Sequence, residues 1–438
     1  MARPRVLSAL AVSLLFADVL PAQPPEDDIA PFTWETLAER LSEEAEAGFT
    51  GAVLVVRDRE VVLDAGSGLA NRQHRIPVRP DTIFAVGSEP IDFTHAAILR
   101  LAQDGTISLA DPITGFFDGV PEDKRGITLE HLMTGASGLR DFHDLPGDRD
   151  PDHSWIDRDE AMRRIFAQEL LFPPGTGEEH SHSAWGVLAA IVEIASGSTY
   201  QEFTRRHVFE PAGMVDTGFN GDPVPEERLA IGYGPRSDGE INAPPYWGPT
   251  SWLVMGSGGQ ISTTRDISRF LTAMREGRIL EPDWARRFFG PGVGASRNGD
   301  MYGFEMFVYH SPMAETHLVT LTNANDPGPE GGDDTRFIRV SRALGRFVLG
   351  PYLPRFRLGV AFGGVVDGAL LVESVEPGSA AERDGLRAGD RLVAIAGGAI
   401  GDDWRAALDP HLRSGEPVAF RLLRGGEEIE VVVRPEPR

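Results

Sequence analysis

Few side chains in this sequence could carry out covalent chemistry, and this narrows the reactions that it can support. The chain has no cysteine, which excludes disulfides, thiolate catalysis and cysteine-type zinc sites. Lys124 is its only lysine, and it lies in a loop-like run where a surface position is expected. A Ser–His pair remains a workable nucleophile and base when a third group orients the ring. The candidates for such chemistry are Ser88, His180 and His182.

Each candidate also has a structural interpretation. Ser88 precedes an expected helix with Pro90 in its first turn, a pattern typical of an N-cap, and capping is the interpretation favoured for this serine. His182 could join His180 and a glutamate in a metal site, because His-x-His on a strand or loop can chelate an ion. No third ligand is identified, so neither a metal nor another cofactor is predicted.

The elements expected around these residues are strands at both ends of a first domain, with helices between them. Gly51–Val56 and Val61–Gly66 read as a hairpin. A helix follows Ser88, because apolar residues from Ile91 onward recur at helical spacing until Asp104-Gly105 ends it. Further helices are expected at Thr33–Ala47, Trp185–Ala195 and Thr264–Arg275, and strands at Tyr302–His310 and Thr316–Asn323. This order predicts an α+β domain whose sheet unites the two ends of the domain.

The N-terminus has the pattern of an export signal. Arg3 and Arg5 precede an apolar run from Val6 to Leu20, and Ala22 offers a small residue for cleavage. We therefore expect a signal peptide at residues 1–22 and a periplasmic or secreted protein without a transmembrane helix in the mature chain. The net charge of −24, from 66 acidic and 42 basic residues, argues against a nucleic-acid partner because phosphates would be repelled.

Several blocks of the first domain together resemble the serine β-lactamases and penicillin-binding proteins, in particular the relatives of class C β-lactamases. The blocks are Asp81–Phe84 through Ser88 to Pro112, Ile127–Leu132 with Ala136–Leu139, Pro174–Gly175 with His180–Gly186, Gly258–Asp266, and Val319–Asn323. The resemblance covers roughly residues 45 to 345. It implies a β-lactamase/transpeptidase-like fold at residues 30–350, with an antiparallel sheet flanked by helices and a helical subdomain.

Three positions depart from the pattern that this resemblance implies. The Ser-x-x-Lys motif reads Ser88-Glu89-Pro90-Ile91, and isoleucine has no proton acceptor. The Tyr-x-Asn motif is replaced by His180 and His182. The His/Lys-x-Gly motif has only His310-Ser311-Pro312 as a counterpart, in a region that looks shortened.

The resemblance also suggests how the remaining residues could still act. In the family fold the side chain of His180 would point at Ser88, with Glu178 or Glu179 to orient the ring. Ile91 would be a core residue that fills the space left by the lysine.

The chain beyond Leu349–Pro354 changes to short strands with turns, which predicts a second domain at residues 355–438. Leu370–Gly397 resembles the core of a bacterial PDZ module. Such modules bind peptide C-termini by adding a strand to a sheet edge. The resemblance places the carboxylate-binding loop at Arg357, Leu358, Gly359 and Val360, with Arg355 or Arg357 available to assist electrostatically.

The missing family residues favour an exported, non-catalytic relative that binds peptides or cell-wall fragments through its cleft and its PDZ domain. The alternative is an active esterase, amidase or peptidase that uses Ser88 with His180 as base. A Ser88–His180 contact within about 3.5 Å in an open cleft would favour the alternative.

Overall fold

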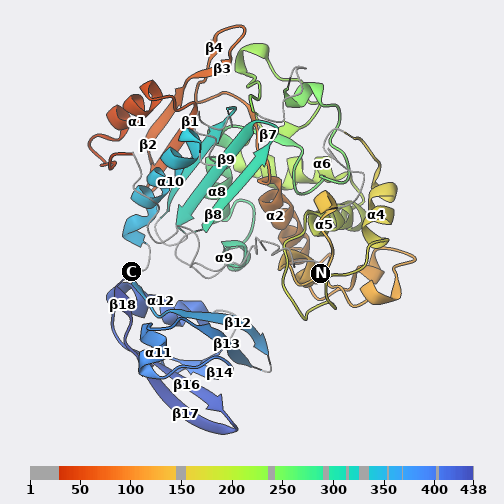
Figure 1. Ribbon diagram of the computed structural model, residues 1–438. Coiled ribbons are helices and arrows are strands. Elements are labelled where there is room, and N and C mark those ends of the chain that lie inside the picture. The colour runs from red at the N-terminus through yellow and green to blue at the C-terminus, as the bar shows by residue number, and fades with distance from the viewer. Residues whose placement is uncertain are drawn as a thin grey trace, which may run out of the picture.

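The computed structural model describes residues 29–144, 154–234, 242–289, 295–311, 315–324, 335–352, 355–366, 368–400 and 404–437. The expected signal peptide at residues 1–22 lies outside these ranges. The described chain forms two units, which Figure 1 shows as separate bodies. Buried apolar side chains form two clusters in the first unit and a third cluster in the second unit, so each unit has its own core.

The first unit is organised around a five-stranded antiparallel sheet of order β2-β1-β10-β9-β8. Its strands are β1 (Gly51–Arg57), β2 (Glu60–Ser67), β8 (Ala295–Met301), β9 (Phe304–Ser311) and β10 (Thr316–Thr322). The expected hairpin is confirmed as β1 and β2. The sheet unites the two ends of the unit, because Ala52 of β1 pairs with Leu321 of β10.

Helices cover both faces of this sheet. Alternate residues of a strand point to opposite faces, so neighbouring residues of β1 pack against different helices. Val53 and Val55 of β1 pack in a cluster with α1 (Leu37–Glu46) and α10 (Arg336–Leu349). Ala52 belongs to a larger cluster with α2 (Pro90–Gln103), α5 (His182–Ser196) and α8 (Thr264–Arg275). The expected α+β architecture, with helices flanking an antiparallel sheet, is confirmed.

The remaining elements of the first unit are short. The helices are α3 (Leu129–Met133), α4 (Arg158–Phe166), α6 (Tyr200–Thr204), α7 (Glu210–Ala212) and α9 (Pro282–Phe289), with single turns η1 (Ile113–Gly115), η2 (Glu122–Lys124), η3 (Phe142–Asp144), η4 (Arg205–Phe209), η5 (Glu226–Arg228), η6 (Pro244–Tyr246) and η7 (Gly350–Tyr352). The small strands are β3 (Leu69–Asn71), which pairs with β4 (Ile76–Pro77), and β5 (Phe84–Ala85), β7 (Gln260–Ser262) and β6 (Gly218–Phe219), which form a second sheet. In Figure 1, α4, α5 and α6 gather beside the main sheet, as expected for a helical subdomain.

The described part of the second unit comprises a six-stranded antiparallel sheet, a two-stranded sheet of β11 and β18, and two helices. Its elements are β11 (Phe356–Arg357), β12 (Val360–Val366), β13 (Ala369–Val375), α11 (Ala380–Asp384), β14 (Arg391–Ile395), β15 (Gly398–Ala399), α12 (Trp404–Ser414), β16 (Val418–Arg424), β17 (Glu427–Val433) and β18 (Glu436–Pro437). The strand order is β12-β13-β14-β16-β17, so β12 lies at an edge of the sheet. An edge strand leaves one row of backbone groups open to a further strand.

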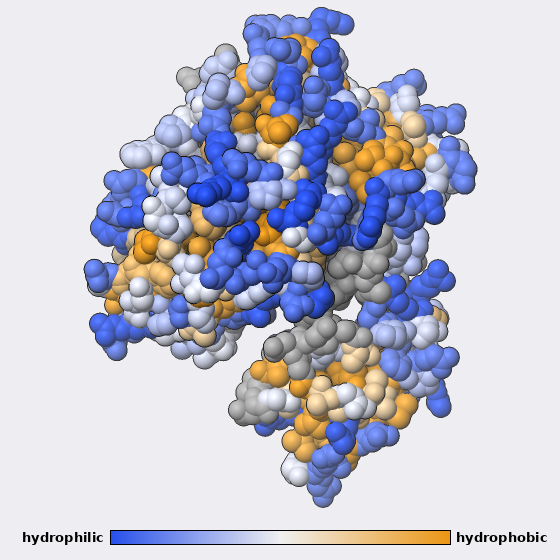
Figure 2. Space-filling model, turned by 180° about the vertical axis from the view of Figure 1, so that it is seen from behind, coloured by the Kyte–Doolittle hydropathy of each residue, from blue (hydrophilic) through white to orange (hydrophobic). Residues whose placement is uncertain are grey.

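Hydrophilic residues cover most of the face of the molecule seen in Figure 2, with apolar patches between them. Among the described residues, no helix combines the length and the apolar character that crossing a bilayer requires.

Candidate active site

Ser88 is presented by a tight connection between the small sheet and the central helix. Strand β5 pairs with β7 and leads through Gly87, which has a φ of 45°, to the start of α2. Ser88 is partly exposed, whereas every other residue from 82 to 94 is buried. The N-cap of α2 is Glu89, and no side chain caps this helix, so the capping interpretation of Ser88 is wrong. The backbone N–H of Ser88 donates to no partner among the described residues, which leaves it available at the helix N-terminus.

The side chain that contacts Ser88 is His182, the first residue of α5. Ser88 Oγ lies 3.4 Å from His182 Nε2, at the long end of the hydrogen-bond range. Contacts between catalytic groups are often long in ligand-free proteins and shorten when substrate binds. Ser181 caps α5 by accepting the N–H of Ala184, and this holds the backbone of His182 at the helix start.

Asp141 fixes the orientation of the His182 ring from the other side. Its Oδ2 lies 3.1 Å from His182 Nδ1 and also accepts the backbone N–H of His182 at 2.8 Å. The other oxygen, Oδ1, lies 2.7 Å from Nδ1 of His143. The carboxylate therefore favours the tautomer with a proton on Nδ1 of His182, and Nε2 is left to accept a proton from Ser88.

The protonation states suit this arrangement. Burial lowers the pKa of His182 to about 3; the Asp141 carboxylate opposes this effect, and His143 and His180 add to it. Burial by itself would raise the pKa of Asp141, but the hydrogen bond from His143 and the charge interaction with His182 hold that pKa well below its usual range. At neutral pH the imidazole of His182 is neutral and the carboxylate is ionised, which are the states that a general base and its orienting partner need.

The structure brings together two of the three residues that the sequence suggested for chemistry. His182 forms the hydrogen bond with Ser88 that had been expected of His180. The ring of His180 stands nearly perpendicular to that of His182, with 4.7 Å between the centroids. The orienting carboxylate is Asp141 rather than Glu178 or Glu179. Asp141 follows the matching block that ends at Leu139, but no spacing in the sequence connects it with Ser88.

Neither Ile91, at the motif position, nor Lys124, the only lysine of the chain, supplies a base to Ser88. Ile91 is buried in the main apolar cluster, as expected of a core residue. Lys124 is also buried and donates to Asp123 at 2.7 Å, so the surface position expected for it is wrong. Its ammonium group is held within η2 by a neighbouring carboxylate. The amine that the family pattern would place beside Ser88 has no counterpart among these residues.

A second Ser–His pair shows why geometry alone does not make a site. Ser268 Oγ lies 2.7 Å from Nε2 of His317, a shorter contact than the one at Ser88. Both residues are buried, with 7% and 2% of their surface exposed. A substrate cannot reach this pair, which links α8 to β10, whereas Ser88 and His182 are both partly exposed.

The third expected motif is not part of this arrangement. His310 is buried near the end of β9, and its ring lies 5.3 Å from that of Phe289. Pro312 lies outside the described residues. The edge of the sheet is formed instead by β8, which pairs with β9 from Ala295 to Met301. This strand was not expected, because Asn298, Gly299 and Asp300 are residues typical of turns.

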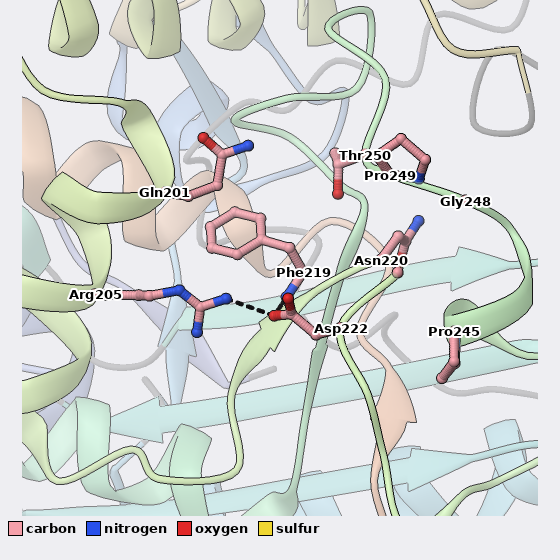
Figure 3. Close-up of a pocket in the computed structure, with 10 residues that line it drawn as sticks. Gln201, Arg205, Phe219, Asn220, Asp222, Pro245, Gly248, Pro249 and Thr250 are labelled. Atoms are coloured by element: carbon pink, nitrogen blue, oxygen red, sulfur yellow. Dashed lines mark hydrogen bonds and ion pairs between the residues drawn. The ribbon is translucent and has the colours of Figure 1, made fainter.

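The cavity drawn in Figure 3 lies apart from these residues. It has a volume of about 500 Å³ and is lined by Gln201, Arg205, Phe219, Asn220, Gly221, Asp222, Pro245, Gly248, Pro249 and Thr250. Arg205 forms an ion pair with Asp222 across it. None of the lining residues is Ser88, Asp141 or His182, and the ion pair already neutralises the charged groups. We therefore do not assign the chemistry to this cavity.

A possible metal-ligand set shares residues with the candidate site. Asp141, His180 and His182 each offer one ligand atom, and these atoms lie within 4.8 Å of one another. The sequence suggested the two histidines together with a glutamate, but the third residue of the cluster is an aspartate. Asp141 occupies that position because the segment before η3 folds against the start of α5.

The second unit contains the loop suggested for binding a carboxylate. Leu358 is buried, Gly359 has a φ of 73°, and Val360 begins β12. Arg357 is paired with Glu376 at 2.7 Å and with Glu436 at 3.1 Å, so its charge is largely neutralised within the unit. The guanidinium of Arg357 is therefore engaged by two carboxylates, and the backbone groups of the loop are the remaining candidates for contact with a ligand.

Comparison with known proteins agrees with both units. A family model described as Beta-lactamase matches residues 37–343, and a model described as PDZ domain matches residues 371–434. PbpX of Bacillus subtilis, whose name assigns it to the penicillin-binding proteins, is 29% identical over 291 residues, which are 64% of this chain and 71% of PbpX. Esterase EstB of Burkholderia gladioli is 30% identical over 297 residues, which are 59% of this chain and 75% of EstB.

A solved structure supports the fold of the first unit. The crystal structure of a penicillin-binding protein from Bacillus halodurans aligns with a TM-score of 0.58 and 22% identity, over 71% of this chain and 98% of that one. The expected fold is therefore confirmed, and the Beta-lactamase model extends over more than half of the chain. The protein belongs to the β-lactamase family, among the serine hydrolases related to penicillin-binding proteins, and carries a C-terminal PDZ domain.

Proposed function

We propose that the first domain is an active serine hydrolase that cleaves carboxylic esters by acyl transfer. Ser88 is the nucleophile, His182 the general base and Asp141 the group that orients the base. The observation that carries this proposal is the continuous chain of contacts, 3.4 Å from Ser88 Oγ to His182 Nε2 and 3.1 Å from His182 Nδ1 to Asp141 Oδ2. Such a constellation is recognised by its geometry and not by its order in the sequence.

In the first half of the reaction, Ser88 Oγ bonds to the carbonyl carbon of the substrate while its proton passes to His182 Nε2. Asp141 stabilises the imidazolium that forms. The backbone N–H of Ser88, two residues before α2 begins at Pro90, can donate to the oxyanion of the tetrahedral intermediate. The alcohol then leaves with the proton from His182, and the acyl group remains on Ser88.

In the second half, water attacks the acyl-Ser88 ester and gives a proton to His182 Nε2. The same proton returns to Ser88 Oγ as the carboxylic acid leaves, so the enzyme is regenerated. No lysine or tyrosine is required in either half. The missing family residues favoured a non-catalytic binding protein on sequence grounds. In the proposed mechanism His182 takes over the proton transfer, and Asp141 orients its ring.

Esters are the substrate class that we favour. An ester needs less help from the general acid than an amide, because an alkoxide leaves far more readily than the amide anion that an unprotonated amide nitrogen would have to become. The relative EstB is named as an esterase. The first domain would then act on esters, and amides would be slower substrates.

Labelling with a fluorophosphonate probe tests the nucleophile. We expect stoichiometric labelling of the wild-type protein at Ser88, located by peptide mass spectrometry, and no labelling of Ser88→Ala. Ser268→Ala is the matched control, because Ser268 also contacts a histidine but is buried, and it should label like the wild type. A wild-type protein that is folded by circular dichroism yet resists the probe would contradict the proposal and favour the binding protein.

We also propose that the PDZ domain binds the free C-terminus of a peptide. Strand β12 lies at the sheet edge, where a peptide strand can be added. The carbonyls of Leu358 and Gly359 accept backbone hydrogen bonds from α11 and from the loop before it. Within the described chain, the N–H groups of these two residues donate to no partner, so they can hold a carboxylate.

The carboxylate requirement can be measured with one peptide in two forms. We expect a fluorescent peptide ending in a free valine carboxylate to bind the full-length protein, and its C-terminal amide to bind at least about tenfold more weakly, the effect of losing charge-assisted hydrogen bonds. Fluorescence anisotropy provides both affinities. Equal binding of the two forms, or binding of neither, would argue against this role of the loop.

The domain limits and the cellular location are proposals as well. We propose an exported protein with its first domain at residues 30–350 and its PDZ domain at residues 355–438. The support is the N-terminal pattern from Arg3 to Ala22 and the penicillin-binding proteins among the relatives. N-terminal sequencing of the protein from its native host should begin at Gln23, and a sequence that begins at Met1 would contradict cleavage.

A further inference from the structure

Three side chains near Ser88 form a compact set of metal ligands that the proposed reaction does not need as a set. Asp141, His180 and His182 each offer one ligand atom, and the atoms lie within 4.8 Å of one another. All three residues are partly exposed, so an ion can reach them from solvent. The reaction proposed above uses Asp141 and His182 but gives no role to His180.

The chemical types of these three ligands favour Zn²⁺ over calcium or magnesium. Two imidazoles and one carboxylate, with a position left for water, are typical of Zn²⁺ sites. Calcium and magnesium prefer oxygen ligands and are not suited to this set. Zn–N and Zn–O distances of about 2.0–2.2 Å in tetrahedral geometry place ligand atoms about 3.4 Å apart, so the ligand atoms, which lie within 4.8 Å of one another, must approach by up to about 1.4 Å. The net charge of −24 favours the approach of cations.

Binding of such an ion is incompatible with the role of His182 as a base. That role needs a proton on Nδ1, bonded to Asp141, and a free lone pair on Nε2, which faces Ser88. A cation on Nε2 occupies that lone pair. A cation on Nδ1 leaves the ring proton on Nε2, because a neutral imidazole ligand carries its proton on the other nitrogen. In both cases His182 can no longer accept the proton of Ser88.

We propose that Asp141, His180 and His182 form a Zn²⁺ site whose occupation reversibly switches off the hydrolase. The binding of the ion stands on the ligand geometry alone, whereas the switch rests on the proposed function. Substitution of His180 distinguishes metal binding from the hydrolase reaction, since His180 belongs to the metal site and not to the Ser88–His182–Asp141 chain of contacts.

Metal binding is tested first, without reference to activity. Full-length protein freed of metal with a chelator is titrated with Zn²⁺ by calorimetry, and Co²⁺ is added separately to record the visible absorption of a nitrogen- and oxygen-ligated ion. We expect one equivalent of Zn²⁺ to bind and His180→Gln to weaken it at least about tenfold. His207→Gln is the matched control, because His207 is partly exposed and lies outside the cluster on η4, and it should bind like the wild type.

The switch is then measured as the ratio of fluorophosphonate labelling rates without and with saturating Zn²⁺. We expect a ratio above about 100 for the wild type, the usual contribution of a general base, and a ratio near one for His180→Gln at the same Zn²⁺ concentration. Magnesium at that concentration should have no effect.

The possible failures are distinguishable. Labelling in chelator together with the absence of Zn²⁺ binding would overturn the metal site and leave the hydrolase intact. Binding of Zn²⁺ to a protein that never labels would support the site and overturn the switch. Faster hydrolysis with Zn²⁺, in the wild type or in Ser88→Ala, would also overturn the switch.

Discussion

Replacing His182 by glutamine is expected to lower the rate of ester hydrolysis by about 10²–10⁴-fold, the contribution of a general base. Glutamine keeps hydrogen-bonding groups near Ser88 but cannot accept its proton at neutral pH. The substitution removes the proton acceptor that lies 3.4 Å from Ser88 Oγ and the imidazole that Asp141 orients through its 3.1 Å contact. The measurement is kcat for a chromogenic short-chain ester, in buffer that contains a chelator.

His180→Gln is the matched control for His182→Gln. The two histidines lie two residues apart and both are partly exposed, so general effects of removing an imidazole should be similar. We expect His180→Gln to lose less than about tenfold in kcat, because the base is the other ring. A larger loss of kcat in His180→Gln than in His182→Gln would instead support His180 as the base for Ser88, as the family resemblance suggested.

Replacing Asp141 by asparagine is expected to lower kcat by about 10⁴-fold, the loss known for neutralising the carboxylate of a Ser–His–Asp triad. The amide can donate to His182 Nδ1 and so favours the tautomer that has its proton on Nε2. It also removes the charge that stabilises the imidazolium during the reaction. KM should change much less than kcat, because the ester does not contact Asp141 in the proposed mechanism.

Asp141 also has structural contacts, and a control must separate them from its role in the reaction. Its carboxylate accepts the backbone N–H groups of His182 and His143. His143→Gln removes the other ring on the carboxylate but not the charge, and we expect it to keep more than a tenth of wild-type kcat. If Asp141→Asn also keeps more than a tenth of kcat while its melting temperature falls, the residue is structural and the proposed triad is wrong.

Much of the fold follows from local patterns in the sequence. The hairpin of β1 and β2 was expected because two apolar runs flank a polar turn, and its strands lie within a residue or two of the expected positions. The helix after Ser88 was expected because apolar residues from Ile91 onward repeat at helical spacing, and α2 confirms it. Strand β8 was missed, because Ala295–Met301 carries turn-forming residues and is held by pairing with β9 rather than by its own propensity.

The sequence by itself determined which chemistry was possible. Without cysteine and with a single lysine, a Ser–His pair remained a workable nucleophile and base, and the blocks around Ser88 and His180–Gly186 pointed to the family that the comparisons confirm. The sequence also showed that Ile91 stands where the family has its lysine. These conclusions depend on residue types and short spacings, which a linear chain displays directly.

Only the tertiary structure decided which side chains meet. His182 is 94 residues from Ser88 and 41 from Asp141, and no sequence periodicity relates positions so far apart. The choice between His180 and His182 depends on where α5 begins, because His182 is the first residue of the helix after the N-cap Ser181, whereas His180 precedes that cap. Ser88 reaches His182 rather than capping its own helix because α2 packs against α5 in the main core. Packing between distant elements, and not local propensity, assembled this site.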